Sequence, residues 1–218
     1  MKKIIAVVPV RKGSQRVKNK NFKKFCGKNL LEYKIDILKK VRNIDDIIVN
    51  TDSKRAILIA KKLKVNFFRR ENYFASSKCT NSEFWSNIAS VTPSKYILFT
   101  HCTSPMIKVK TYEQTIKKFF LNKNKFNSLN TVSDVKEFLF LKNKPLNFRI
   151  NKAPNSQNLP NIVKLNFAIS ILETNFMEKK KTLIGTKPLF YKLDQIEGHD
   201  INTPYEFEFA KHLFKNTR

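Results

Sequence analysis

Glycine, cysteine and acidic residues are scarce in this sequence. It has four glycines and three cysteines, and its 17 acidic residues stand against 43 lysines and arginines. The three cysteines (Cys26, Cys79 and Cys102) are odd in number and lack metal-ligand spacing, which indicates a reducing compartment rather than a disulfide framework. We therefore expect a cytoplasmic protein whose cysteines serve in packing.

Long hydrophobic runs are also missing, and no apolar segment approaches the length that crosses a membrane. The run Ile4–Val10 follows Lys2 and Lys3 and superficially resembles a signal peptide. It is short, contains Pro9 and lacks a small-residue cleavage site, so it predicts a buried first strand instead. With 41% hydrophobic residues in 218, the chain can bury a proper core. We expect one soluble domain over residues 1–218 and no membrane partner.

The formal net charge of +26 suggests a nucleic-acid partner, because lysine and arginine neutralise phosphates in such complexes. The lysines are spread over the whole chain, however, with no run longer than Lys179–Lys181. No helix-turn-helix, zinc finger or stacking platform accompanies them. The pattern argues against nucleic acid and is more typical of a compositional bias of the genome. A non-catalytic nucleotide- or nucleic-acid-binding protein stays as the alternative from another functional class.

In the first half of the chain, segments whose apolar residues have the spacing of a strand alternate with segments that have the spacing of a helix. This alternation indicates βαβ units and a largely parallel sheet. The expected strands are Lys3–Pro9, Asp46–Asn50, Val65–Phe68 and Tyr96–Thr100. The expected helices are Leu30–Val41, Ser53–Leu63, Ser82–Val91 and Thr111–Leu121. Ser53 and Ser82 are plausible N-caps for two of these helices.

After Phe126 the spacing of the apolar residues becomes less regular. A strand-like stretch at Ser128–Val132 precedes a polar, proline-containing excursion at about residues 134–162. Regular apolar patterns resume at Val163–Leu172 and Pro188–Leu193. We expect a last helix at Pro204–Phe214, with Thr203 as its N-cap and proline at its first position.

A basic loop, Arg11–Asn21, directly follows the first strand. Ligands bind at the carboxyl ends of strands in parallel sheets. Gly13 would let backbone N–H groups approach phosphate oxygens, and Ser14 could add a hydroxyl donor. Four cationic side chains could surround a triphosphate: Arg11, Arg16, Lys18 and Lys20. By composition alone the loop is more often a solvated basic segment, since it is neither a P-loop nor a GxGxxG turn.

This loop, R-K-G-S-Q-R-V-K-N-K-N, resembles the opening signature of the CMP-sialic acid synthetase family, the acylneuraminate cytidylyltransferases. The resemblance implies an α/β fold, a Rossmann-like three-layer sandwich with a mostly parallel mixed sheet. It also implies that the loop binds the phosphates of CTP through Arg11, Gly13, Ser14, Gln15, Lys20 and Asn21. Gln15 stands where the family usually has lysine, and Arg16 where glycine is common.

Two further segments match the nucleotide side of the family. Asn50-Thr51-Asp52 resembles its Ser-Thr-Asp, and Arg70-Glu71 with Ala75–Asn81 resembles the segment that reads the nucleotide. The resemblance implies that Arg70 and Asn81 face the cytidine and that Thr80 also belongs to the nucleotide-binding residues. Without it, Arg70 would equally be a surface cation after a strand.

Residues 101–105, His-Cys-Thr-Ser-Pro, resemble the family's Gln-Pro-Thr-Ser-Pro and imply acceptor contacts for His101, Thr103 and Ser104. Because His101 replaces a glutamine, a histidine merely bonded at a strand end is an equal alternative.

Two partial matches imply that Gln157 and Asn166 bind the acceptor. Residues 156–160 resemble Arg-Gln-x-Leu-Pro, and residues 166–169 resemble Asn-Gly-Ala-Ile. Ser156 lacks the arginine that could pair with a sugar carboxylate, and Phe167 fills space where the family has glycine.

Residues 200–203 resemble the family's Asp-Ile-Asp-Thr magnesium motif, which implies Mg²⁺ on Asp200 and Asn202. Alternation along an extended segment puts both side chains on one side, where oxygen ligands could gather around one ion. Asn202 brings a neutral carbonyl oxygen where the family has aspartate. A structural role for Asp200 as a helix cap is the alternative.

The implied reaction is transfer of CMP from CTP to an acidic, sialic acid-like nonulosonic sugar, with release of pyrophosphate. Arg11, Lys20 and Asp200 are the expected catalytic residues, and no general base is assigned. Because members of the family usually form homodimers, the resemblance implies a homodimer in which the excursion at about residues 134–162 takes part in dimerisation and acceptor binding. A different acidic or phosphorylated acceptor in surface-glycan synthesis is the runner-up.

Overall fold

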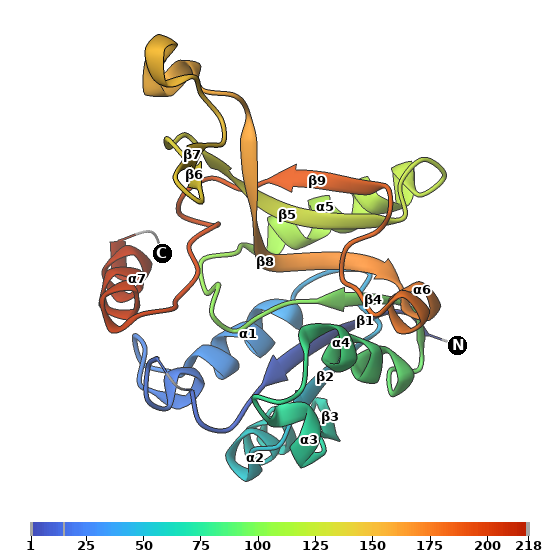
Figure 1. The fold of residues 1–218 in the computed structure, drawn as a ribbon. Coiled ribbons are helices and arrows are strands. Elements are labelled where there is room, and N and C mark those ends of the chain that lie inside the picture. Colours follow the sequence, from blue (N-terminus) through green and yellow to red (C-terminus); the bar gives the residue numbers. More distant parts are fainter. Residues whose placement is uncertain (1, 15, 217–218) are drawn as a thin grey trace.

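A central sheet of seven strands organises the computed structural model, which describes residues 2–14 and 16–216 (Figure 1). In spatial order the strands are β3 (Asn66–Arg69), β2 (Asp46–Thr51), β1 (Lys2–Val10), β4 (Ser94–Phe99), β8 (Ile162–Glu173), β5 (Ser128–Val135) and β9 (Pro188–Lys192). Only β8 runs antiparallel to its neighbours, β4 and β5; the other adjacent pairs in this sheet are parallel. The expected mostly parallel mixed sheet is confirmed.

Helices cover both faces of the sheet (Figure 1). They are α1 (Leu30–Leu38), α2 (Lys54–Lys62), α3 (Asn72–Ala75), α4 (Asn81–Ser90), α5 (Val109–Asn122), α6 (Thr174–Lys180) and α7 (Pro204–Asn216). Along β1, Ile4 and Ala6 pack into one hydrophobic cluster while Ile5 and Val7 pack into another, as the alternation of a strand requires. The first cluster includes residues of α1, α2, α5 and α7, and the second includes residues of α4 and α6. Three layers result, and among the described residues no helix is both long and apolar enough to span a bilayer.

Helix caps follow local chemistry, with one shift from expectation. The Ser53 hydroxyl caps α2, accepting from the Ala56 N–H at 3.4 Å. We expected Ser82 to cap α4, but Thr80 does so. Thr80 is the N-cap rather than Ser82, because Glu83 lies three residues after Thr80 and completes a capping box with it.

The last helix also starts as expected. The N–H of Glu206 donates to the Thr203 hydroxyl at 3.2 Å, and the Thr203 N–H donates to the Glu206 carboxylate at 2.7 Å. Thr203 therefore forms a capping box at the start of α7, which orients the segment that enters the helix.

The excursion projects away from the sheet (Figure 1). It holds a short hairpin, β6 (Phe140–Leu141) and β7 (Lys144–Pro145), and two 3₁₀ turns, η2 (Ile150–Lys152) and η3 (Ser156–Asn158). Several large apolar side chains of this arm are exposed: Phe138, Phe140, Leu141, Leu146 and Ile150.

Parallel pairing brings four loops to one edge. Val10 pairs with Thr51, and Thr51 pairs with Arg69, so β1, β2 and β3 end together. On the other side of β1, Val7 pairs with Phe99 near the end of β4. The segments after these strands, which carry most of the expected site residues, therefore share one edge of the sheet.

Candidate functional site

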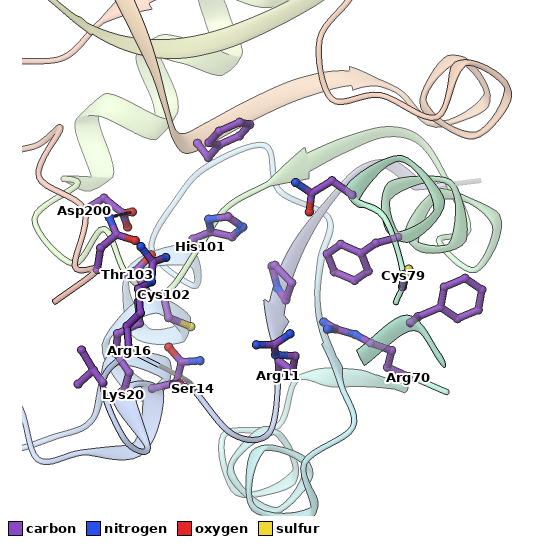
Figure 2. A pocket seen from close by; sticks show the side chains of 18 of the residues that line it. Arg11, Ser14, Arg16, Lys20, Arg70, Cys79, His101, Cys102, Thr103 and Asp200 are labelled. Atoms are coloured by element: carbon purple, nitrogen blue, oxygen red, sulfur yellow. Dashed lines mark hydrogen bonds between the residues drawn. The ribbon is translucent and has the colours of Figure 1, made fainter. Parts of the chain in front are cut away.

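A polar cavity of about 480 Å³ opens at this edge (Figure 2). Its walls come from the basic loop, the segment after β3, the start of α4, the end of β4, β8 and the segment before α7. The expected residues that line it are Arg11, Ser14, Lys20, Asn21, Arg70, Asn81, His101, Thr103, Asp200 and Asn202. Residues from six separated parts of the chain thus meet in one cavity.

The basic loop is anchored to the neighbouring strand end. The Lys12 N–H donates to the Asp52 carboxylate at 2.7 Å, which holds the loop against the segment after β2. Gly13 has a φ of +74°, a conformation that glycine adopts without strain, and a side chain there would meet open space. Its contribution is backbone shape, which fits its absence from the cavity lining. Gln15 lies outside the described residues.

Lys20 connects the basic loop with the Asp200 segment. Its Nζ donates to the carbonyl of Ile201, the residue between Asp200 and Asn202. Burial lowers the pKa of Lys20, an effect that Asp200 opposes and Arg16 reinforces. In Figure 2, Arg16, Lys20 and Asp200 gather on one side of the cavity, with Arg70 on the other.

Only one of the two oxygens of the Asp200 carboxylate accepts a hydrogen bond from the described residues. Oδ2 accepts a 2.8 Å hydrogen bond from the Asn202 amide, whereas Oδ1 is buried without a hydrogen-bond partner among the described residues. Within that part of the chain, no group of three or more His, Cys, Asp and Glu residues could hold a metal by itself. A lone carboxylate with an amide oxygen still fits Mg²⁺, which commonly takes one or two carboxylates and completes its shell with substrate phosphates and water.

Arg70 is fixed in the opposite wall. Its Nε donates to Asn50 Oδ1 at 2.7 Å and its Nη2 to the Asn50 carbonyl at 2.8 Å. The guanidinium lies 4.4 Å from the centre of the Phe84 ring. Burial lowers the pKa of Arg70 to about 10, so the group stays charged at neutral pH. The alternative of a surface cation is excluded, because Arg70 is 5% exposed.

Thr80 and Ser104 do not line the cavity. The Thr80 hydroxyl is used in the cap of α4. Ser104 is buried, and its carbonyl accepts a 3.0 Å hydrogen bond from Lys34 Nζ. Both residues shape segments that carry cavity residues, Asn81 and Thr103 respectively.

His101 faces the cavity at the end of β4. Its ring lies 5.0 Å from Phe99 and 6.4 Å from Phe167, measured between ring centres, and it makes no hydrogen bond to the described residues. A histidine bonded at the strand end is therefore not what the structure contains. Burial lowers the pKa of His101 to about 4, against the opposing effect of Asp200, so the imidazole is neutral at pH 7.

The structure does not bring Gln157 and Asn166 into the cavity lining. Gln157 is exposed on η3 in the projecting arm. Asn166 is buried, and its amide oxygen accepts hydrogen bonds from the Thr131 hydroxyl at 2.6 Å and the Ala168 N–H at 3.2 Å. In this arrangement Asn166 joins strands β5 and β8.

Arg16, which we expected beside a triphosphate, also lines the cavity, as does Phe167, which we expected to fill space. Cys79 and Cys102, expected only in packing, line it too. The lining residues without any expected role are Pro9, Val17, Phe74, Ser76 and Phe84. Phe84 could have been found from its spacing, because it follows Asn81 by three residues and shares its face of α4. Phe74 lies on α3, which at four residues is too short to give a periodic signal.

Comparison with known proteins identifies the family. The model of a family described as cytidylyltransferase matches residues 5–213. An N-acylneuraminate cytidylyltransferase of Escherichia coli is 27% identical over 221 residues, covering 95% of this chain and 51% of that protein. A pseudaminic acid cytidylyltransferase of Campylobacter jejuni is 26% identical over 131 residues, covering 57% of this chain and 56% of that protein. The chain thus spans about half the length of these two relatives.

A solved structure shares the fold. CMP:2-keto-3-deoxy-manno-octonic acid synthetase, complexed with CTP, superposes with a TM-score of 0.73 at 14% identity, covering 99% of this chain and 100% of that one. At this identity the likeness concerns the Rossmann-like architecture.

Proposed function

This chain belongs to the cytidylyltransferase family, and from that premise we propose that it transfers CMP from CTP to an acidic nonulosonic sugar and releases pyrophosphate. One observation carries the proposal: Lys20 of the basic loop contacts the carbonyl between Asp200 and Asn202. The contact joins the basic loop to the segment that carries the Asp200 oxygen without a partner in the described part of the chain, which supports a site where cations and a carboxylate act on the same phosphates.

The two ends of the cavity suit the two ends of a nucleotide. Arg11, Ser14, Lys20 and Asn21 offer cationic and polar groups to a triphosphate. Arg70, which lies over Phe84 next to the start of α4 and is held in place by Asn50, offers a planar cation to a base. The arrangement supports nucleotide binding with the phosphates towards Asp200.

In the proposed reaction, the anomeric hydroxyl oxygen of the sugar forms a bond to the α-phosphorus of CTP, the bond to pyrophosphate breaks, and the hydroxyl proton passes to water. Arg11 and Lys20 stabilise the negative charge that grows on the leaving pyrophosphate. Asp200 and Asn202 would hold Mg²⁺, which when bound neutralises phosphate charge as a Lewis acid. Positioning and charge neutralisation thus supply the catalysis.

A different acidic or phosphorylated acceptor is the second candidate. It is favoured by the acceptor side of the cavity, where Gln157 and Asn166 are not lining residues and Phe167 occupies space. The nucleotide half of the proposal is the same for both candidates.

We also propose that the chain forms a homodimer through the projecting arm. The support is the row of exposed apolar side chains on residues 138–150, including Phe140 at 58% and Ile150 at 71% exposed. Light scattering on wild-type protein and on Ile150→Asp tests this: a dimer that dissociates in the variant is expected, and a wild-type monomer would contradict it.

Pyrophosphate release tests the function. Protein is mixed with Mg²⁺, each of the four triphosphates in turn and a panel of acidic sugars; release with CTP and one sugar is expected. Lys20→Ala and Asp200→Ala should each lower turnover on the order of 100-fold or more. Lys24→Ala and Asp36→Ala, which change exposed or partly exposed charges away from the cavity, serve as matched controls. Near-normal turnover in either cavity variant would refute the mechanism.

A further inference from the structure

Phe167 has a backbone conformation that aromatic residues rarely adopt. Its φ is +53°, in the left-handed region, although it lies within strand β8. The strand is irregular there: between the pairs Asn130–Ser170 and Val132–Leu165, four residues of β8 face only Thr131 of β5. Such a conformation persists only when the surroundings hold it, and residues in such conformations cluster at active sites and ligand-binding segments.

Hydrogen bonds hold the backbone on both sides of Phe167. Before it, the amide oxygen of Asn166 accepts from the Thr131 hydroxyl at 2.6 Å and from the Ala168 N–H at 3.2 Å. After it, the Ala168 carbonyl accepts from the Thr100 hydroxyl at 2.6 Å. Thr131 of β5 and Thr100, which follows β4, thus hold the irregularity from opposite sides, and with it the direction in which the Phe167 side chain leaves the backbone.

The ring forms part of an aromatic wall of the cavity. Its centre lies 6.4 Å from that of Trp85, at an interplanar angle of 31°, and 6.4 Å from that of His101, at 37°. Phe167 and His101 both line the cavity. The wall is aromatic, unlike the cationic loop that supplies Arg11 and Lys20.

An aromatic wall discriminates between sugar substituents. A methyl group placed on it gains dispersion contacts and leaves water without losing hydrogen bonds. A hydroxylated chain placed there loses hydrogen bonds to water that the rings do not replace. The ring also takes up volume that a glycine would leave open, so it excludes a bulkier chain.

We propose that Phe167 determines acceptor specificity: with His101 it selects an acidic sugar that presents a compact apolar group to the cavity over one that presents a polyhydroxylated chain. The inference rests on the proposed function and deepens it. Phe167 contacts the acceptor and takes no part in bond making, so its removal changes which sugar reacts and leaves the affinity for CTP unchanged.

The test compares kcat/KM for two probes, pseudaminic acid, whose side chain ends in a methyl group, and N-acetylneuraminic acid, whose side chain is polyhydroxylated. Wild-type enzyme should prefer pseudaminic acid. Phe167→Gly, which suits the left-handed backbone, should shift the ratio of the two kcat/KM values towards N-acetylneuraminic acid by about 10-fold or more. The KM for CTP should stay constant. Phe167→Leu should shift the ratio in the same direction by less.

Phe176→Ala is the matched control, because Phe176 packs against the same hydrophobic cluster without lining this cavity. Its ratio should equal that of wild type. Two results would overturn the inference but leave the proposed function standing. In the first, wild type turns over the sugars but the ratio of the two kcat/KM values is unchanged in both Phe167 variants. In the second, wild type prefers N-acetylneuraminic acid. If the wild-type enzyme fails to release pyrophosphate with every acidic sugar in the panel, the proposed function is refuted, and the inference is refuted with it.

Discussion

The amine of Lys34, on α1, donates a 2.7 Å hydrogen bond to the hydroxyl of Tyr112, on α5, and both side chains are buried. The same amine donates to the Ser104 carbonyl at 3.0 Å. The Tyr112 hydroxyl in turn lies 2.8 Å from the Thr100 hydroxyl at the end of β4. Burial raises the pKa of Tyr112, so its hydroxyl stays protonated. These bonds join two helices to the segment that carries His101 and Thr103.

Replacing Lys34 with methionine should destabilise the protein by about 2–4 kcal/mol, because the variant keeps the volume but loses the buried hydrogen bonds to the Ser104 carbonyl and the Tyr112 hydroxyl. Urea unfolding measures the change. In a double-mutant cycle with Tyr112→Phe, the two losses should be non-additive by about 1–3 kcal/mol. A methionine variant as stable as wild type would show that the cost of burying the ammonium cancels its hydrogen bonds.

Replacing Arg70 with lysine should weaken CTP binding by roughly 10–100-fold, because lysine cannot make the two directed bonds to Asn50 and also keep a planar cation over Phe84. Isothermal titration calorimetry with CTP measures the loss. Arg69→Lys is the matched control, since its neighbour Arg69 is exposed and outside the cavity lining. Equal affinities in the two variants would contradict a nucleotide-binding role for Arg70.

The basic loop and the elements around it could be predicted from sequence because their signals are local. A buried apolar run followed by cations predicts a strand and the loop at its end, and Ser53 and Thr203 cap helices through neighbours three residues away. The position of β8 could not be predicted in this way. Its apolar run indicates burial, but nothing within it encodes insertion between β4 and β5 in the antiparallel direction.

Long-range pairing also decides the environment of individual side chains. The motif around Asn166 predicts a residue facing the acceptor, yet in the fold its amide oxygen accepts from Thr131, 35 residues away. The left-handed backbone of Phe167 follows from the same pairing. Neither feature has a local signal, since both depend on which strand lies beside β8.

Cys102 should react slowly with iodoacetamide although it lines the cavity. Burial raises the pKa of its thiol to about 12, while Lys34 and Lys20 oppose the shift. At pH 8 its thiolate fraction is therefore roughly 1,000-fold below that of an ordinary cysteine. A raised pKa contributes stability that is complete below the unfolded-state value and is lost as pH rises towards 12.

Mass spectrometry after timed alkylation at pH 8 checks this behaviour residue by residue. Cys102 should be labelled far more slowly in the native protein than in denaturant, and its native rate should rise steeply with pH. If Cys102 is labelled in the native protein as fast as in denaturant, its thiol is not buried.

The backbone strain at Phe167 has its own signature in stability. Alanine and glycine at position 167 both remove the ring, but only glycine adopts a φ of +53° without strain. Phe167→Gly should therefore be more stable than Phe167→Ala by about 1–2 kcal/mol in urea unfolding. At Ile169, which is buried in the same strand and is not among the residues with positive φ, the order should reverse, with alanine favoured by about 0.5–1 kcal/mol. If alanine is as stable as glycine at position 167, the strand does not impose the left-handed conformation, and the ring is free to leave the acceptor side of the cavity.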